Sequence, residues 1–285
     1  MAVEVVSIVI AIVSLVATLV AASIAGFMSL YKDDRTRFKE AEAVRAKYRD
    51  PLSLAVQDLQ ARLRNFVDDD LAKWIHDSRK EYLLLHTCFL FGQFFSWVHI
   101  LRQEVQFLSC STEKANKELT GVLRKIRCVL GEGSKESPPG YCVLYFGEQH
   151  ALGEVMTVVE SEQPRCLGYA RFCCRWKEEE VFRGWFERLC NELTELAEAE
   201  VSSKSRPMDH RLRMLQHLLI DLIGVLDPKL VSGEFGYTRR CSPAPGCPCN
   251  SEQCVNWIRS SREAGEKVLS FSEDSGQILV TAISV

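Results

Sequence analysis

The pattern of apolar and polar positions along the chain begins with one long apolar run. Residues 5–30 read VVSIVIAIVSLVATLVAASIAGFMSL, 26 residues without a charged side chain. About 20 apolar residues in a helix cross the roughly 30 Å hydrocarbon core of a bilayer. The run therefore predicts a transmembrane helix over residues 1–30 that meets the lipid bilayer through residues 5–30. A cleaved signal peptide is the alternative, but it has a basic leader and a shorter apolar core.

The charges that flank this run predict its orientation. Residues 31–49 carry seven Lys and Arg side chains, whereas residues 1–4 carry none. Basic residues stay on the cytosolic side of a membrane span, so we expect the amino terminus outside or in a lumen and the body in the cytosol. Residues 31–49 contain no Gly or Pro and predict a charged helical stalk. Asp50 and Pro51 then predict a break, with a new helix starting at the proline.

Further along, apolar residues recur at helical spacing in five segments. These segments are residues 51–67, 78–108, 111–130, 178–200 and 208–226. Each has a stripe of apolar side chains at offsets of three and four, which is typical of amphipathic helices. The runs YCVLYF at 141–146 and LGYARF within 166–173 are compatible with strands and are expected to pair as a small hairpin.

One of these segments competes with the first as a membrane span. Residues 82–101 carry no formal charge and are long enough to cross a bilayer. Polar residues within the segment and Arg102 directly after it favour a buried core helix instead. The alternative matters because a second span would place the rest of the chain outside the cytosol.

Together the patterns predict a mainly α protein. We expect a transmembrane anchor at 1–30, a stalk at 31–49, a cytosolic multi-helix bundle at 50–228 with at most a small β element, and a largely disordered tail containing cysteines at 229–285. The formal net charge of −3 argues against nucleic-acid binding. Twelve cysteines would suggest disulfides outside the cell, but the predicted topology places them in a reducing compartment.

The tail contains the densest group of potential metal ligands. Cys241, Cys247, Cys249 and Cys254 lie in CSPAPGCPCNSEQC, and four thiolates can bind zinc tetrahedrally. Their spacing lacks the paired C-x2–4-C of common structural sites. The alternative is four thiols in a flexible tail without metal, so zinc is a weak candidate cofactor.

A second weak site lies in the segment GEQHALGE. Glu148, His150 and Glu154 are close in sequence, and the last two share a helix face at a spacing of four. They could serve acid–base or metal chemistry, although the second histidine of H-E-x-x-H is missing. Solvated or mutually paired polar groups at a helix start are the alternative. No nucleotide, kinase or hydrolase motif is present.

The apolar run also offers a surface for self-association. Ala17, Ala21 and Ala25 recur every four residues, and small residues at this spacing let two membrane helices approach closely. A homodimer through this face is therefore a possible partner interaction, beside an unknown protein partner.

Five stretches together resemble an uncharacterised family of single-pass membrane-anchored helical proteins. The stretches are YRDPLSLAVQDLQARLRNFV, LFGQFFSWVHILRQEVQFL, YFGEQHALGEVM, CLGYARF and LQHLLIDLIGVLDP, within residues 48–228. The resemblance implies a helical domain with these boundaries but no activity, and it does not include the tail.

Two classes of function follow. The first is a non-enzymatic interaction or scaffolding protein held at a membrane by one helix. The alternative is a membrane-tethered enzyme with a site near Glu148, His150 and Glu154.

Overall fold

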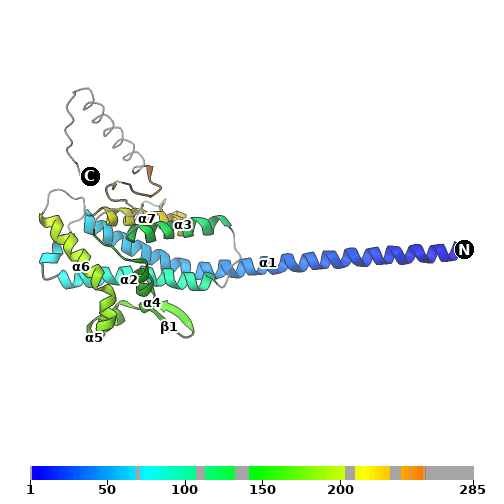
Figure 1. The fold of residues 1–285 in the computed structure, drawn as a ribbon, viewed down its shortest axis with the longest axis horizontal. Helices are drawn as coiled ribbons and strands as arrows, with labels where there is room; N and C mark the ends of the chain where they lie inside the picture. Colours follow the sequence, from blue (N-terminus) through cyan, green and yellow to red (C-terminus); the bar gives the residue numbers. More distant parts are fainter. Residues whose placement is uncertain are drawn as a thin grey trace, which may run out of the picture.

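A single helix, α1 (Ala2–Val67), runs through the first quarter of the chain and continues into the helical domain. The computed structural model describes residues 2–68, 71–106, 113–131, 141–202, 209–231, 239–244, 246–252 and 254. The first half of α1 extends far from the other elements, and its second half lies among them (Figure 1). The extension and the domain therefore share one continuous backbone.

The predicted break at Asp50 and Pro51 is wrong, because α1 passes through the proline without ending. A proline inside a helix removes one backbone hydrogen bond and costs about 3 kcal/mol. Tyr48 and Leu52 on either side of it are buried, 4% and 1% exposed, in the core. Packing of these flanking turns holds the helix together where local propensity favours a break.

Three helices surround the second half of α1. They are α2 (Lys80–Gln106), α3 (Glu113–Leu130) and α7 (His210–Leu226). Helices α2 and α7 both pack directly on α1, and α3 packs on α7. The shared core is fully buried and is built from apolar side chains of all four helices: Leu59, Leu63, Phe91, Ile100, Val129, Leu215, Leu218 and Leu222. A short 3₁₀ helix (Leu71–His76) joins α1 to α2.

A second group of elements covers the other side of α2. It contains α4 (Phe146–Val155), a hairpin of β1 (Thr157–Glu160) and β2 (Gln163–Cys166), α5 (Tyr169–Glu178) and α6 (Glu180–Ser202). Phe172 of α5 lies 5.5 Å from Phe89 of α2 and 5.3 Å from Phe186 of α6, measured between ring centroids. These edge-on ring contacts join the second group to the central bundle.

The hairpin exists, but both predicted strand positions are wrong. Residues 141–145 form no strand, and 169–172 begin helix α5. The actual strands pair antiparallel with Thr157 opposite Cys166. Ser161 and Glu162 form the turn with positive φ of 52° and 63°, the backbone of a type I′ turn. Neither residue is the Asn or Gly that normally marks this turn, so the sequence carried little signal for it.

The cysteine-containing part of the tail also differs from expectation. After the short helix α8 (Pro228–Val231), residues 239–244 and 246–252 pack on the bundle, and Cys241 and Cys254 are 3% and 1% exposed. Ordered packing replaces the predicted disorder here. Residues 255–285 lie outside the described part of the chain.

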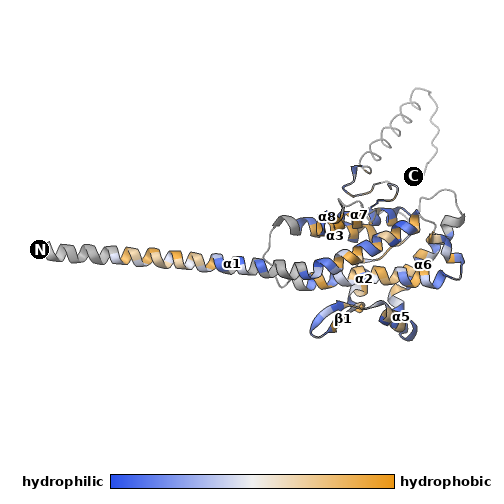
Figure 2. Ribbon diagram, turned by 180° about the vertical axis from the view of Figure 1, so that it is seen from behind, coloured by the Kyte–Doolittle hydropathy of each residue, from blue (hydrophilic) through white to orange (hydrophobic). Residues whose placement is uncertain are grey.

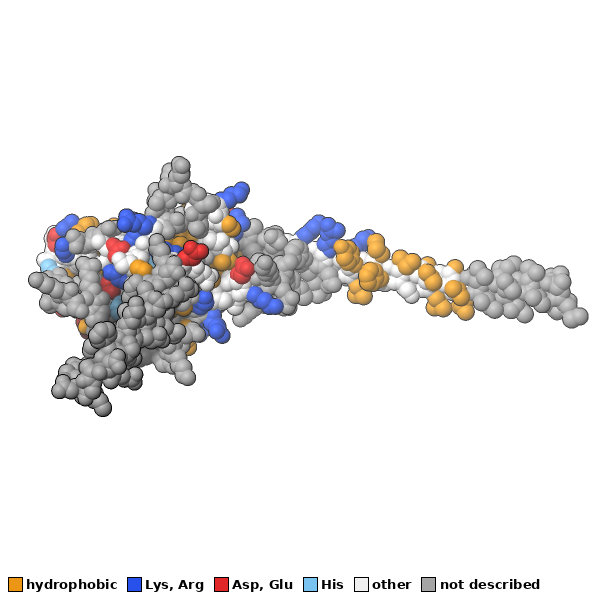
Figure 3. Space-filling model, turned by 90° about the horizontal axis from the view of Figure 1, so that it is seen from above, with side chains coloured by type: hydrophobic (Ala, Val, Ile, Leu, Met, Phe, Trp, Pro, Cys, Tyr) orange, Lys and Arg blue, Asp and Glu red, His pale blue; other side chains and the backbone are white. Residues whose placement is uncertain are grey.

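Within the described residues, two helices are long and apolar enough to cross a membrane by length and composition. The window Ser14–Lys32 in α1 is not buried at all, whereas 72% of the window Lys80–Gln103 in α2 is buried inside the protein. Figure 2 shows the apolar belt on the extension of α1, and Figure 3 shows basic side chains between this belt and the domain. The mainly α fold class with one tiny sheet is confirmed, and α2 has the burial of a core helix.

Helix α4 approaches α2 so closely that one glycine is required. A Cβ on Gly153 would lie 2.8 Å from the Phe95 carbonyl oxygen, whereas a Cβ on Gly147 of the same helix would meet nothing within 4 Å. We predict that Gly153→Ala lowers the free energy of unfolding by about 1–3 kcal/mol, because backbone must move. Urea denaturation monitored by circular dichroism measures this.

Gly147→Ala is the matched control. It should leave stability unchanged or raise it by up to about 1 kcal/mol, because alanine is the better helix former. Equal stability of the two variants would contradict the close packing of α4 on α2.

Candidate metal centre

Helix α7 and the tail bring four potential metal ligands to one place. His217 comes from the middle of α7, and Cys247, Cys249 and Cys254 come from the tail. All four residues are buried, and their ligand atoms lie within 4.8 Å of one another. This group could hold a metal ion, and it joins residues up to 37 positions apart.

The distances around His217 match a tetrahedral site. Its Nδ1 lies 3.2 Å from the sulfur of Cys254 and 3.6 Å from the sulfurs of Cys247 and Cys249. Zinc bonds of about 2.3 Å to sulfur and about 2.1 Å to nitrogen, at tetrahedral angles, separate nitrogen from sulfur by about 3.6 Å. The side chains are therefore spaced as ligands of one ion would be.

A backbone hydrogen bond orients the imidazole of His217. Its Nε2 lies 2.9 Å from the carbonyl oxygen of Cys241, and a carbonyl can only accept. Nε2 therefore donates this hydrogen bond, and Nδ1 is the ring nitrogen that faces the three sulfurs. Metal-binding histidines commonly use such a bond to fix the tautomer and the ring orientation. Cys241 thus contributes its backbone carbonyl to the centre.

The three thiols have very different proton affinities. Hydrogen bonding from Cys247 is the largest effect on Cys249 and lowers the pKa of Cys249 to about 3. The same hydrogen bond raises the pKa of Cys247, and burial raises the pKa of Cys254 to about 11. A cation at the centre of the three sulfurs would favour the ionised form of each of them.

Polar contacts to α7 hold the tail in place. Asp221 accepts hydrogen bonds from Arg240 Nη2 at 2.6 Å and from the backbone N–H of Asn250 at 3.0 Å. Gln216 donates to the carbonyl of Arg239 at 3.0 Å and accepts from the N–H of Cys241 at 3.2 Å. Residues of α7 on either side of His217 therefore hold the tail before the cysteine cluster, at residues 239–241, and within it, at Asn250.

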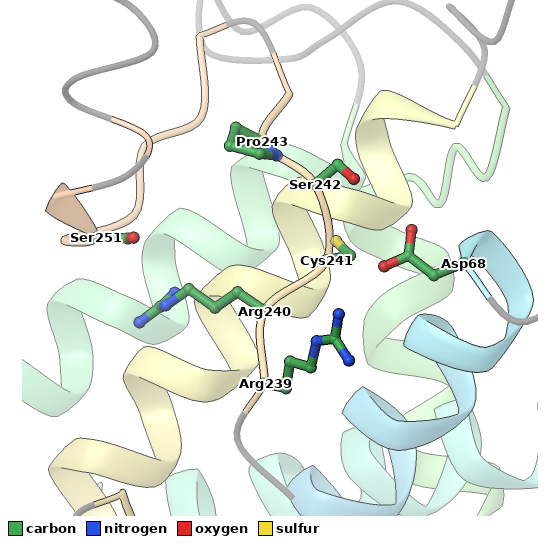
Figure 4. A pocket seen from close by; sticks show the side chains of 7 residues that line it. All are labelled: Asp68, Arg239, Arg240, Cys241, Ser242, Pro243 and Ser251. Atoms are coloured by element: carbon green, nitrogen blue, oxygen red, sulfur yellow. The ribbon is translucent and has the colours of Figure 1, made fainter. Parts of the chain in front are cut away.

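Cys241 faces away from the cluster. Figure 4 shows its side chain beside Asp68, in a cavity of about 560 Å³ lined also by Arg239 and Arg240. Its sulfur lies 3.8 Å from the Arg213 carbonyl oxygen of α7, and burial raises its pKa to about 12. This thiol behaves as a buried structural group.

The sequence thus predicted three of the four potential ligands. Cys241 was expected in the set and is not in it, whereas His217 was missed. His217 lies inside an apolar helix 30 residues before Cys247, so no motif spacing joins them. Its one signal was that it is the buried polar residue on a core stripe that needs a partner.

The other candidate site residues, Glu148, His150 and Glu154, all lie on α4. Glu148 accepts a hydrogen bond from the N–H of Tyr145 at 2.8 Å and pairs with Arg188 at 2.7 Å, so it caps α4 and ties it to α6. His150 and Glu154 are exposed on the same helix. Burial of its ring and nearby Arg127 lower the pKa of His150. These contacts account for Glu148 structurally.

Comparison with protein-family models, curated protein sequences and solved structures gave no match. The resemblance to a family of membrane-anchored helical proteins therefore stays a prediction.

We predict that the purified full chain carries one metal ion and that Cys249→Ser removes it. The variant loses a buried ligand whose charge no serine can replace, and the tail should then exchange amide hydrogens at least tenfold faster at residues 239–254, a change of about 1.4 kcal/mol. Elemental analysis and hydrogen exchange measure both effects.

Cys241→Ser is the matched control, because it changes a buried thiol of the same tail outside the cluster. It should retain the metal. Loss of metal in both variants, or in neither, would count against the geometry described for His217 and the three cysteines.

Proposed function

We propose that this protein is a single-pass membrane protein that holds a helical domain on the cytosolic side and acts in interaction or scaffolding, with a structural zinc ion in its tail. The observation that carries the proposal is the continuity of α1. One helix supplies both an exposed apolar segment and the centre of the domain core.

The exposure of α1 supports a lipid environment for its first half. Leu15, Leu19 and Phe27 are 62%, 60% and 70% exposed, and this part of α1 is mostly hydrophobic (Figure 2). A helix with apolar side chains on every face lies either in lipid or in a protein core. The described elements of the domain do not cover the first half of α1. Helix α2 is the weaker candidate, because most of its apolar surface is already buried.

The stalk sets the distance between the bilayer and the domain. Lys32 ends the apolar window, and Tyr48 is the first described residue of α1 that is buried in the core. Sixteen residues of helix span roughly 24 Å. Lys32, Arg35 and Lys39 are exposed on this stretch and suit the cytosolic side of a span. The domain would stand off the membrane on a rigid helical rod.

The donor set of the metal centre supports a structural role for zinc. Three sulfurs and one imidazole nitrogen fill a tetrahedral coordination shell, whereas catalytic zinc sites keep one position for water or substrate. Soft thiolate ligands also favour zinc over magnesium or calcium. Such a centre fastens the tail to α7 and leaves the surface of the domain for partners.

A second copy of the chain is one such partner. Ala17, Ala21 and Ala25 lie on the exposed part of α1, where two helices could approach closely in a membrane.

We predict that Val20→Arg combined with Ile24→Arg releases the protein from membranes into the alkaline-soluble fraction. Each arginine at the centre of a span costs about 2.5–3.5 kcal/mol on insertion scales. Fractionation of cells at high pH, followed by detection of a tag at the carboxyl terminus, measures the effect.

Val159→Arg combined with Val181→Arg is the control, because these residues are also exposed and apolar, 74% and 81%, but belong to the domain. This variant should stay in the membrane pellet. If the unaltered protein is itself extracted at high pH, the proposed anchor is wrong.

Protease digestion of the tag only after permeabilisation would support the orientation.

A further inference from the structure

A cavity of about 470 Å³ lies between α1, the 3₁₀ helix and α2, on a part of the domain distant in sequence from the metal centre. Aromatic rings form much of its wall: Trp74, Tyr82, His86 and Phe89. The rings of Tyr82 and His86 are stacked, with centroids 5.4 Å apart and an interplanar angle of 8°. A flat, aromatic-walled cavity of this size accepts a small planar molecule.

Arg62 brings a buried positive charge to this cavity. Arg62 is 9% exposed, and its guanidinium carbon lies 5.7 Å from the centre of the Tyr82 ring. One N–H of Arg62 donates to Nδ1 of His86. Among the described residues no carboxylate forms an ion pair with Arg62. A guanidinium has five N–H donors and is always charged, so most of its hydrogen-bonding capacity faces rings and the cavity.

A buried guanidinium without an opposite charge beside it is unusual in proteins. A buried charged group is costly unless an opposite charge and hydrogen bonds compensate it. Two other arginines of the described residues are buried: Arg213 meets Asp209 at 2.7 Å and Asp68 at 3.0 Å, and Arg211 donates to the backbone carbonyls of Val129 and Gly131. Arg62 has only a neutral imidazole and a phenol ring, so an anion is the group that its surroundings lack.

A second polar atom in the same cavity also lacks a partner. Gln93 Oε1 is buried and accepts no hydrogen bond within the described residues. Buried acceptors are nearly always satisfied, by protein, water or ligand. Gln93 lies on the same helix as His86, two turns along, and lines the same space. The cavity therefore offers donors at Arg62, and Gln93 of its lining carries a buried acceptor without a partner among the described residues.

From these contacts we infer that the cavity is a binding site for a small planar organic anion that also carries a hydroxyl or N–H donor. The acidic group of the ligand pairs with the guanidinium of Arg62. Its ring lies against the aromatic wall, and its donor reaches Gln93 Oε1. This site is independent of the proposed membrane anchor and of the metal centre, and it adds a ligand to a domain whose proposed role is interaction.

The charges around the cavity favour an anion over a cation. Arg62 already occupies the face of Tyr82 where a cation would bind. Arg79 lies over the Trp74 ring at 4.1 Å, and its charge is paired with that of Asp77. Asp58 is the one acidic residue of the described lining, and its carboxylate opposes an anion where it is ionised; burial raises its pKa. Removing its charge should therefore strengthen anion binding.

The test is calorimetric titration of the full chain in detergent with 4-hydroxybenzoate, a planar anion with a hydroxyl donor. We expect saturable one-to-one binding with a Kd of about 1 mM or tighter. The uncharged probe 4-hydroxybenzamide, which has the same shape, should bind at least tenfold more weakly. Arg62→Gln should weaken binding of the acid at least tenfold, and Asp58→Asn should tighten it.

Arg64→Gln is the matched control, because it removes a charge two residues away on α1 that does not line the cavity. It should leave the affinity unchanged. Arg62→Lys keeps the charge but loses the planar fork, so it should fold normally and bind with intermediate affinity; circular dichroism checks both Arg62 variants. Absence of saturable binding to the unaltered protein, or equal affinity of unaltered protein and Arg62→Gln, overturns the inference.

Discussion

The packing of the second half of α1 against α2 and α7 is the interaction on which the rest of the structure depends. Leu59 and Leu63 are completely buried, and Leu52 is 1% exposed, so this half of the helix is the centre of the domain. A buried leucine contributes about 1.5–3 kcal/mol, enough in combination to carry the helix through Pro51. The same helix is exposed and apolar in its first half, and this continuity couples the orientation of the domain to that of the apolar segment.

Helix α7 packs on α1 and also carries buried polar residues that hold other segments beside it. Its buried polar residues all meet partners that come from distant parts of the chain. Gln216 donates to Gln60 of α1 at 3.1 Å, and Arg213 pairs with Asp68 at 3.0 Å. His217 faces the three cysteines of the tail. Polar groups on a core helix need partners, and here they fix which segments lie beside α7. The metal centre would make the last of these connections permanent.

The cavity around Arg62 contains a buried charged group that lacks such a partner. Arg62 of α1 and Arg213 of α7 are both buried, but of these two only Arg213 has carboxylate partners among the described residues. Natural domains seldom leave a buried charge without a counter-charge unless a bound molecule supplies it. The anchor, the metal centre and this cavity lie in different parts of the molecule, so each can be tested by variants that leave the other two intact.

The sequence alone determined the features that depend on local periodicity. The exposed apolar run, the amphipathic stripes of α3, α6 and α7 and the end of α3 at Gly131 follow from spacing within one segment. Only the tertiary structure decided what depends on distant contacts. Packing overrode the break at Pro51, a turn without Asn or Gly placed the hairpin at 157–166, and His217 replaced Cys241 among the four ligands. Residues 30 positions apart become neighbours only through the fold, and no local pattern records that.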